Sequence, residues 1–243
     1  MRVLVTGAAS GIGRAVAERF ERDGAQVLSV DLRPDPDGPG QGFEADLTTR
    51  EANRAAVDTA VERFGGLDVV VANAGLQHVA PVAEFPEDKW DTLIALLLTS
   101  PFLLAKYAWK ALADADEGRF IGVASAHGLV ASPYMAAYVS AKHGLLGLIK
   151  TLALEGAEEG ILATALCPAF VRTPLVEAQL ADQAKAHDMS EDEVLEKVVL
   201  APHAVKRLIE PEEVAEVVAF LAGPAGRAFT GAALPMDLGW TAR

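Results

Sequence analysis

Tyr138 and Lys142 lie four positions apart in the segment SPYMAAYVSAKHG. On a helix, this spacing places both side chains on one face. A free tyrosine has a pKa of about 10 and is a poor base, but a neighbouring ammonium group favours its phenolate form. Ser125, at the end of a predicted strand, could hold a substrate oxygen beside the tyrosine. A Tyr–Lys pair alone is common on helix surfaces. Together with this serine and a nucleotide site, it becomes specific for moving an alcohol proton.

Three glycines in TGAASGIG suggest a site for a pyrophosphate group. Gly7, Gly11 and Gly13 follow a predicted strand and open a predicted helix. Glycine lets the backbone turn tightly and approach a ligand closely. The helix N-terminus adds free N–H groups and the positive end of the helix dipole. A glycine triplet is weak by itself, but its strand–turn–helix context is the one that the dinucleotide motif requires.

Asp31 ends the second predicted strand and indicates which dinucleotide binds. A carboxylate at this place can accept hydrogen bonds from both ribose hydroxyls and would repel a 2′-phosphate. Ser10 precedes Gly11 in the glycine loop and is not basic, and we interpret Arg14 and Arg33 as surface residues. The sequence therefore predicts NAD rather than NADP as cofactor. The alternative interpretation is that Asp31 is only a turn residue.

Short apolar strands alternate with helices along the chain, which predicts a parallel sheet covered on both faces. We expect one α/β domain over residues 1–243, a doubly wound parallel sheet of the Rossmann type. The predicted strands span 2–6, 26–30, 42–45, 68–74, 119–125, 161–167 and 232–237. The predicted helices span 11–23, 49–64, 87–113, 133–157 and 211–222.

The segment 174–209 is polar, helical and rich in charge, and it interrupts the alternation of strands and helices. We interpret it as a lid over a substrate site at the carboxyl ends of the strands. A solvated helical excursion is the alternative interpretation.

The overall charge argues against some partners. Asp and Glu number 34 against 21 Lys and Arg, a net charge of −13, which disfavours nucleic acid and anionic membranes. Cys167 is the only cysteine, so no intramolecular disulfide forms. The chain opens directly on a predicted strand, and its longest charge-free run, 120–141, is broken by Gly, Ser, Pro and His. We expect a cytoplasmic protein that acts on a small molecule.

With ANAG (72–75) and CPAFVRTP (167–174) added to these motifs, the chain resembles the short-chain dehydrogenase/reductase family over essentially its whole length. The resemblance implies Ser125, Tyr138 and Lys142 as catalytic residues. It places Asp46 at the adenine, Asn73 along the cofactor channel, and Val171 and Thr173 at the nicotinamide carboxamide. The NAD-binding residues implied in this way are Gly7, Ser10, Gly11, Ile12, Gly13, Asp31, Asp46, Leu47, Asn73, Ala74, Gly75, Tyr138, Lys142, Pro168, Val171 and Thr173.

Within this family, the chain is most similar to the D-3-hydroxybutyrate dehydrogenases. The similarity rests on LQHVAPVAEFPEDKWD (76–91), ASAHGLV (124–130), AAYVSAKHG (136–144), CPAFVRTPLVEAQ (167–179) and DLGWTAR (237–243). It implies that Gln77, His127 and Gln179, with Ser125, bind the substrate and that Trp240 closes the pocket. Taken singly, the two glutamines could be loop residues and His127 could be structural.

Two departures from the family pattern bear on chemistry. Leu97 stands where the family usually has an asparagine that holds a water for the catalytic lysine, and leucine forms no side-chain hydrogen bond. Met135 stands where the hydroxybutyrate enzymes have a lysine that pairs with the substrate carboxylate. The loss of that partner could cost about 1.5–3 kcal/mol of binding. A protonated His127 could supply positive charge instead.

The sequence therefore predicts an NAD-dependent oxidoreductase that moves a hydride between nicotinamide and a secondary alcohol. The expected substrate is D-3-hydroxybutyrate or a close 3-hydroxy acid. Met135 leaves open a neutral secondary alcohol or sugar, and Leu97 leaves open a nucleotide-binding scaffold with little turnover. No metal site is predicted. The helical stretch 93–109 is apolar around nearly all of its circumference, and with the family resemblance this implies a homotetramer.

Overall fold

A computed structural model describes residues 1–177, 180, 184 and 189–242. The strands of this part of the chain form one seven-stranded sheet in the order β3-β2-β1-β4-β5-β6-β7, and every neighbouring pair is parallel. The strands are β1 (Arg2–Thr6), β2 (Gln26–Asp31), β3 (Gln41–Glu44), β4 (Val69–Ala72), β5 (Gly118–Val123), β6 (Ile161–Pro168) and β7 (Ala233–Met236). The predicted doubly wound α/β fold is confirmed.

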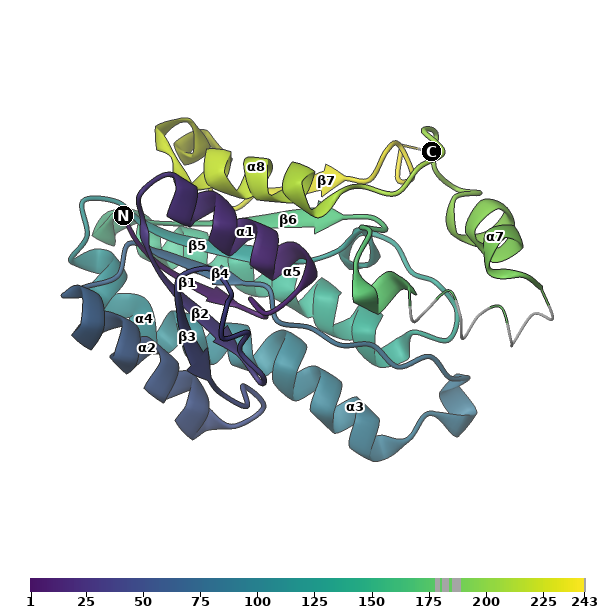
Figure 1. Ribbon diagram of the computed structural model, residues 1–243, viewed down its shortest axis with the longest axis horizontal. Coiled ribbons are helices and arrows are strands. Elements are labelled where there is room, and N and C mark those ends of the chain that lie inside the picture. The colour runs from purple at the N-terminus through teal and green to yellow at the C-terminus, as the bar shows by residue number, and fades with distance from the viewer. Residues whose placement is uncertain (178–179, 181–183, 185–188, 243) are drawn as a thin grey trace.

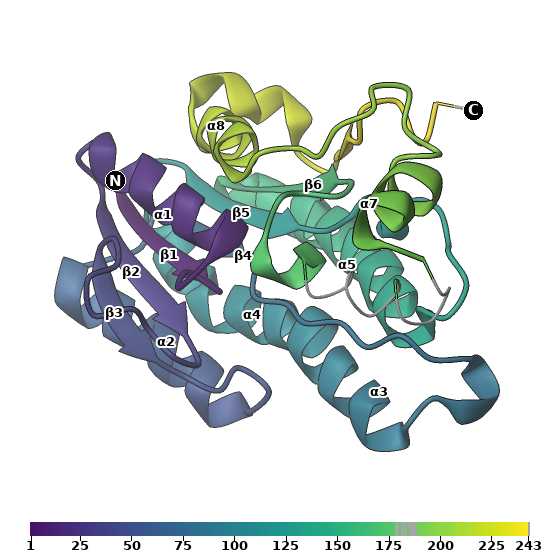
Figure 2. The same ribbon diagram turned by 45° about the vertical axis from the view of Figure 1, so that its right-hand side comes forward.

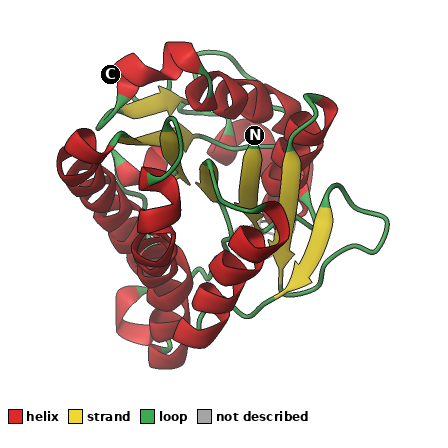
Figure 3. Cartoon of the chain, turned by 90° about the vertical axis from the view of Figure 1, so that its left-hand side faces the viewer, coloured by secondary structure: helices red, strands yellow, loops and turns green. Residues whose placement is uncertain are grey.

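Helices cover both faces of the sheet, as Figures 1 and 3 show. Helices α1 (Gly11–Arg22) and α8 (Pro211–Ala222) pack together on one face. The other face carries α2 (Arg50–Phe64), α4 (Ser100–Ala113) and α5 (Ala136–Gly156). Further helical pieces are η1 (Val82–Glu84), α3 (Glu87–Ile94), the π turn η2 (Ala95–Thr99), η3 (Ala126–Gly128), η4 (Ala157–Glu159), α7 (Glu191–Val194), the π turn η5 (Leu195–Val199) and η6 (Pro224–Phe229).

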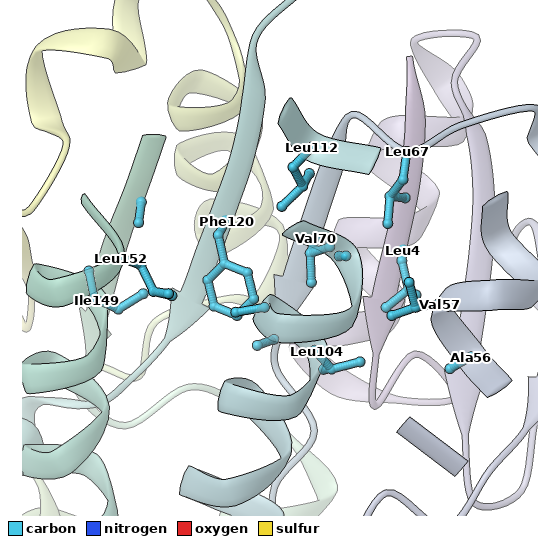
Figure 4. Packing of buried hydrophobic residues seen from close by; sticks show 14 of the residues in the cluster. Leu4, Ala56, Val57, Leu67, Val70, Leu104, Leu112, Phe120, Ile149 and Leu152 are labelled. Carbon is cyan, nitrogen blue, oxygen red and sulfur yellow. The ribbon is translucent and has the colours of Figure 1, made fainter. Parts of the chain in front are cut away.

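The core explains why the central strands read as unbroken apolar runs. Strands β4 and β5 are buried along their whole length because helices cover both of their faces. Phe120 of β5 packs with Leu104 of α4 and Ile149 of α5, and Val70 and Leu4 continue this cluster along the sheet (Figure 4). Full burial of each such side chain contributes about 1.5–3 kcal/mol. The packed sheet therefore holds the residues at the carboxyl ends of its strands in fixed positions.

Two predicted helices differ from the observed ones in informative ways. The stretch predicted at 87–113 is interrupted by the π turn Ala95–Thr99. The helix predicted at 133–157 begins at Ala136, because Tyr134 has a φ of 68° and Met135 is also not helical. A positive φ is costly for a bulky residue.

The stretch Glu87–Ala113 is also long and apolar enough to cross a membrane, judged by length and composition alone. Core helices of soluble proteins pass the same test. Here Leu93, Leu97, Leu103 and Leu104 are buried inside the protein. This burial fits a core helix.

The described part of the predicted lid packs beyond the carboxyl ends of the strands. Helix α7 lies near the C-terminus, on the side toward which β6 and β7 point (Figures 1 and 2). Val176, Val194, Val199 and Leu208 form a small apolar cluster against Phe170. The segment thus has a core of its own beside the predicted substrate site.

Candidate active site

The predicted site residues gather where the strand order reverses. The chain winds from β1 to β2 and β3 on one side of the sheet, and from β4 onward on the other side. In open parallel sheets, ligands bind in the crevice outside the carboxyl ends of the strands at such a switch point. A cavity of about 290 Å³ opens at this place between the glycine loop and helix α5. Its lining residues are Gly7, Ser10, Gly11, Ile12, Asp31, Asn73, Gly75, Val123, Ala124, Tyr138, Lys142, Thr173, Pro174 and Leu175.

The glycine loop has the shape that a bound pyrophosphate requires. Gly7 and Gly11 have φ values of 67° and 53°, which favour glycine. A Cβ atom at Gly13 would lie 2.1 Å from the carbonyl oxygen of Gly7, so that position also needs glycine. Ser10 precedes α1 without a side-chain capping bond. The first N–H groups of α1 can therefore serve a phosphate, and the loop fits a dinucleotide.

Asp31 is held in place at the end of β2. One carboxylate oxygen accepts a hydrogen bond from the Ala9 N–H at 3.1 Å, and the other accepts one from the Arg33 N–H at 3.1 Å. Arg14 is engaged by Glu18 and Asp35. The cavity wall at this end therefore presents a fixed carboxylate.

Other residues of the predicted cofactor set do not line this cavity. The side chain of Asp46 is exposed and accepts hydrogen bonds from Thr48, and that of Leu47 is buried in the core. Pro168 and Val171 are buried, and Ala74 is half-buried. Asn73 lines the cavity and also donates to the carbonyl oxygen of Thr6 at 2.9 Å. That bond ties the ends of β1 and β4 together.

Tyr138 and Lys142 line this cavity, and the Ser125 side chain is hydrogen-bonded to Tyr138. Lys142 donates from Nζ to the carbonyl oxygen of Val123 at 2.8 Å, and Nζ lies 5.6 Å from the centre of the Tyr138 ring. Burial lowers the pKa of Lys142 to about 8, which leaves it mostly protonated at neutral pH.

The predicted effect of Lys142 on the tyrosine is not seen in the protein by itself. Burial raises the pKa of Tyr138, and the Ser125 hydroxyl lowers it by a smaller amount. The phenol therefore stays protonated unless further positive charge arrives beside it. Ser125 accepts a hydrogen bond from the His127 N–H at 3.1 Å. The hydroxyl proton of Ser125 is therefore free to be donated in a second hydrogen bond.

Tyr138 also lines a second cavity, of about 50 Å³. This cavity brings together the predicted substrate residues Gln77, His127 and Trp240 with Ser125. Gln179 lies outside the described residues. Sequence reasoning placed Met135 here but did not anticipate Ala169, Phe170, Leu175 and Val176, which complete the lining.

The aromatic wall of this pocket is continuous. Trp240 stacks on Phe170 with ring centres 5.7 Å apart, and His127 meets Trp240 edge-on at 5.0 Å. His203 is 1% exposed, and its ring centre lies 5.5 Å from that of Trp240. Phe170 is part of CPAFVRTP, two residues after β6. Its aromatic side chain in that motif is the feature from which the sequence could have suggested a place in the pocket wall.

His127 would carry a positive charge only when protonated, and burial makes it neutral at neutral pH. Burial is the main cause that lowers the pKa of His127 to about 4. Gln77 offers an uncharged donor instead, because its Nε2 is buried and has no hydrogen-bond partner within the described chain. A buried amide without a partner is costly, so a ligand acceptor at this place would be favoured.

Comparisons with known proteins identify the family. Residues 7–241 match the family model described as enoyl-(acyl carrier protein) reductase. The uncharacterized oxidoreductase YxjF of Bacillus subtilis (strain 168) is 43% identical, over 99% of this chain and 98% of its own. The chain belongs to the short-chain dehydrogenase/reductase family. The predicted family resemblance is confirmed.

Two further relatives show the range of this family. The D-beta-hydroxybutyrate dehydrogenase of Rhizobium meliloti (strain 1021) is 40% identical, over 99% of this chain and 98% of that relative. The ligand-free structure of Thermoplasma acidophilum aldohexose dehydrogenase matches with a TM-score of 0.93 at 29% identity, covering 99% of this chain and 94% of that one. A short-chain dehydrogenase/reductase of this kind uses a nicotinamide cofactor and acts on a small molecule.

Leu97 departs from the short-chain dehydrogenase/reductase pattern without opening a gap. It lies in the π turn η2, is buried, and packs with Leu93, Ala137 and Ala141 against the same helix that carries Tyr138. This position contributes packing in place of a polar group. The Val123 carbonyl is the hydrogen-bond partner of Lys142 instead.

The protein has a larger cavity, of about 750 Å³, at the amino ends of the strands. Arg2 pairs there with Asp68, and Arg227 with Glu117. None of the predicted site residues lines it. In the part of the chain that is described, no three His, Cys, Asp or Glu side chains form a group that could hold a metal ion.

Proposed function

We propose that the protein is an NAD-dependent dehydrogenase of D-3-hydroxybutyrate or a close 3-hydroxy acid. The observation that carries the proposal is the pocket in which Gln77, His127 and Trp240 meet Ser125 and Tyr138. Its small volume suits a substrate of few carbon atoms, and the unpartnered amide of Gln77 suits an acceptor such as a carboxylate oxygen. The likeness to the Rhizobium meliloti enzyme supports the same substrate class.

The roles of the residues follow from their positions. Ser125 orients the substrate hydroxyl, Tyr138 receives its proton, and Lys142 holds positive charge in the wall of the cofactor cavity. Bound NAD would supply the hydride acceptor and, through its positive nicotinamide ring, a charge that favours the phenolate. Trp240 and Phe170 exclude water from the reacting atoms.

The choice of NAD over NADP is part of the proposal and depends on Asp31. The carboxylate is fixed by two backbone N–H groups and would repel a 2′-phosphate. We expect NAD to support much faster turnover than NADP, and Asp31→Ala to narrow this difference. Equal specificity constants for the two cofactors in the unaltered protein would contradict the assignment.

A neutral secondary alcohol or sugar is the second candidate, and Met135 favours it. The thioether lines the pocket where a charged partner for a carboxylate was expected, and His127 is neutral at pH 7. The aldohexose dehydrogenase with a matching fold also acts on a neutral compound. A panel of D- and L-3-hydroxybutyrate, 2-butanol and aldohexoses, followed by NADH absorbance, separates the candidates. A specificity constant for D-3-hydroxybutyrate below that for 2-butanol would favour the second one.

A further inference from the structure

His127 is anchored through one nitrogen by a residue that the substrate pocket does not include. Its Nε2 lies 2.9 Å from the hydroxyl oxygen of Ser132, which is half-buried in the loop before α5. The His127 ring is 5% exposed and is enclosed edge-on by Trp240, Phe170 and Tyr138. The ring therefore has little freedom, and Ser132 is its polar contact on the Nε2 side.

Because His127 is neutral, the contact with Ser132 determines which of its ring nitrogens donates a hydrogen bond and which accepts one. Burial lowers the pKa of His127 to about 4, so at neutral pH one ring nitrogen donates and the other accepts. A serine hydroxyl can donate to Nε2 or accept from it. Since Nε2 is engaged by Ser132, Nδ1 is the nitrogen left for a ligand, and its role is set by what Ser132 does.

We propose that Ser132 is a positioning residue that donates its hydroxyl proton to Nε2 of His127 and so keeps the ring proton on Nδ1. The inference deepens the proposed function and rests on it, because a carboxylate or carbonyl oxygen can only accept. With this tautomer, His127 joins the Gln77 amide as a second uncharged donor in the pocket. The pocket can then bind an anionic group without a basic side chain at position 135. With the other tautomer, His127 would offer the oxygen only a lone pair.

Kinetics of two matched variants test the proposal against a merely structural role. Ser132→Ala removes the hydroxyl, and Ser132→Thr retains it. For D-3-hydroxybutyrate we expect Ser132→Ala to raise KM about three- to tenfold while kcat stays within about twofold. Ser132→Thr should keep the KM for D-3-hydroxybutyrate at the value of the unaltered protein. The alcohol 2-butanol has no carboxylate, so its KM should not change in either variant. A normal KM for the acid in Ser132→Ala, or an equal loss for acid and alcohol, would overturn the proposal.

A substrate-free measurement keeps this inference separate from the proposed function. In protein labelled with ¹⁵N-histidine, we expect the His127 signals, assigned by their loss in His127→Gln, to show a protonated Nδ1 and a bare Nε2. Ser132→Ala should shift them toward the other tautomer, and Ser132→Thr should not. A protonated Nε2 in the unaltered protein would overturn the inference even if D-3-hydroxybutyrate is oxidised. If no 3-hydroxy acid is oxidised but the expected tautomer is found, only the substrate assignment fails.

Discussion

The cofactor cleft uses the ends of β1, β2 and β4 with the turns beside them, together with residues of β5 and α5, whereas the substrate pocket collects side chains from widely separated segments. Gly7 and Asp31 need only their own strand ends to reach the cleft. Gln77, His127 and Trp240 meet only because the whole sheet and its last strand are in place. Local sequence therefore determines what the cleft can bind, and tertiary packing determines the polarity of the pocket.

Tyr138 belongs to both regions, so its removal should have the largest effect. Tyr138→Phe keeps the ring that lines the two cavities and removes the proton acceptor. We expect kcat to fall by about 10²- to 10⁴-fold, the usual contribution of general acid–base catalysis. Calorimetry should show that NAD still binds. A variant that keeps most of its rate would show that the proton takes another route.

The pocket should respond to pH through His127, whose pKa is lowered from 6.5 to about 4. Between these pH values the unfolded chain binds a proton that the folded protein does not. The free energy of unfolding should therefore fall as pH is lowered from 6.5 to 4, by up to about 3 kcal/mol from this group. His127→Gln should flatten the profile in urea titrations at stepped pH. An unchanged slope would mean that His127 is protonated in the folded protein.

The cleft should be sensitive to a single methyl group where the loop is tightest. Gly13→Ala places a Cβ against the Gly7 carbonyl, and overpacking of this kind costs about 1–3 kcal/mol. We expect lower thermal stability and weaker NAD binding. Gly147→Ala on α5 is the matched control, because a Cβ there meets no atom within 4 Å. It should be neutral or stabilising, since alanine favours helix. Equal thermal stability and equal NAD affinity of the two variants would contradict close packing at Gly13.

Substitution of Met135 should have the smallest effect of the four, and the effect should be confined to acidic substrates. Met135→Lys adds the cation that the pocket lacks among its described lining residues. The specificity constant for D-3-hydroxybutyrate should rise about tenfold, which corresponds to about 1.4 kcal/mol. That for 2-butanol should change little. If the acid gains nothing, the pocket is not a carboxylate site, and the neutral-alcohol candidate takes its place.

The same contrast explains how much the sequence could predict. The strand positions, the glycine loop, Asp31 and the pairing of Tyr138 with Lys142 follow from motifs that act over one strand, one turn or one helix face. The neutral state of His127 depends on burial against Tyr138, Phe170 and Trp240, which lie far apart in the sequence, and no local pattern encodes it.

Two backbone irregularities could also not be predicted from the sequence. The left-handed Tyr134 delays the start of α5, and the π turn at Ala95–Thr99 interrupts an apolar stretch that reads as regular helix. Both involve contacts between segments distant in the sequence, and the π turn packs against α5. The Ala80 N–H, for example, donates to the Tyr134 carbonyl oxygen at 3.0 Å and links the loop of Gln77 to this turn.

The central claim is that the two regions meet at Tyr138 to oxidise a 3-hydroxy acid with NAD. The most direct measurement is NADH absorbance after D-3-hydroxybutyrate and NAD are mixed with the unaltered protein, with the L-enantiomer and the Tyr138→Phe variant as controls. We expect NADH to form from the D-acid and to be nearly absent with either control. No NADH from any 3-hydroxy acid, alongside rapid NADH formation from 2-butanol or an aldohexose, would contradict the claim.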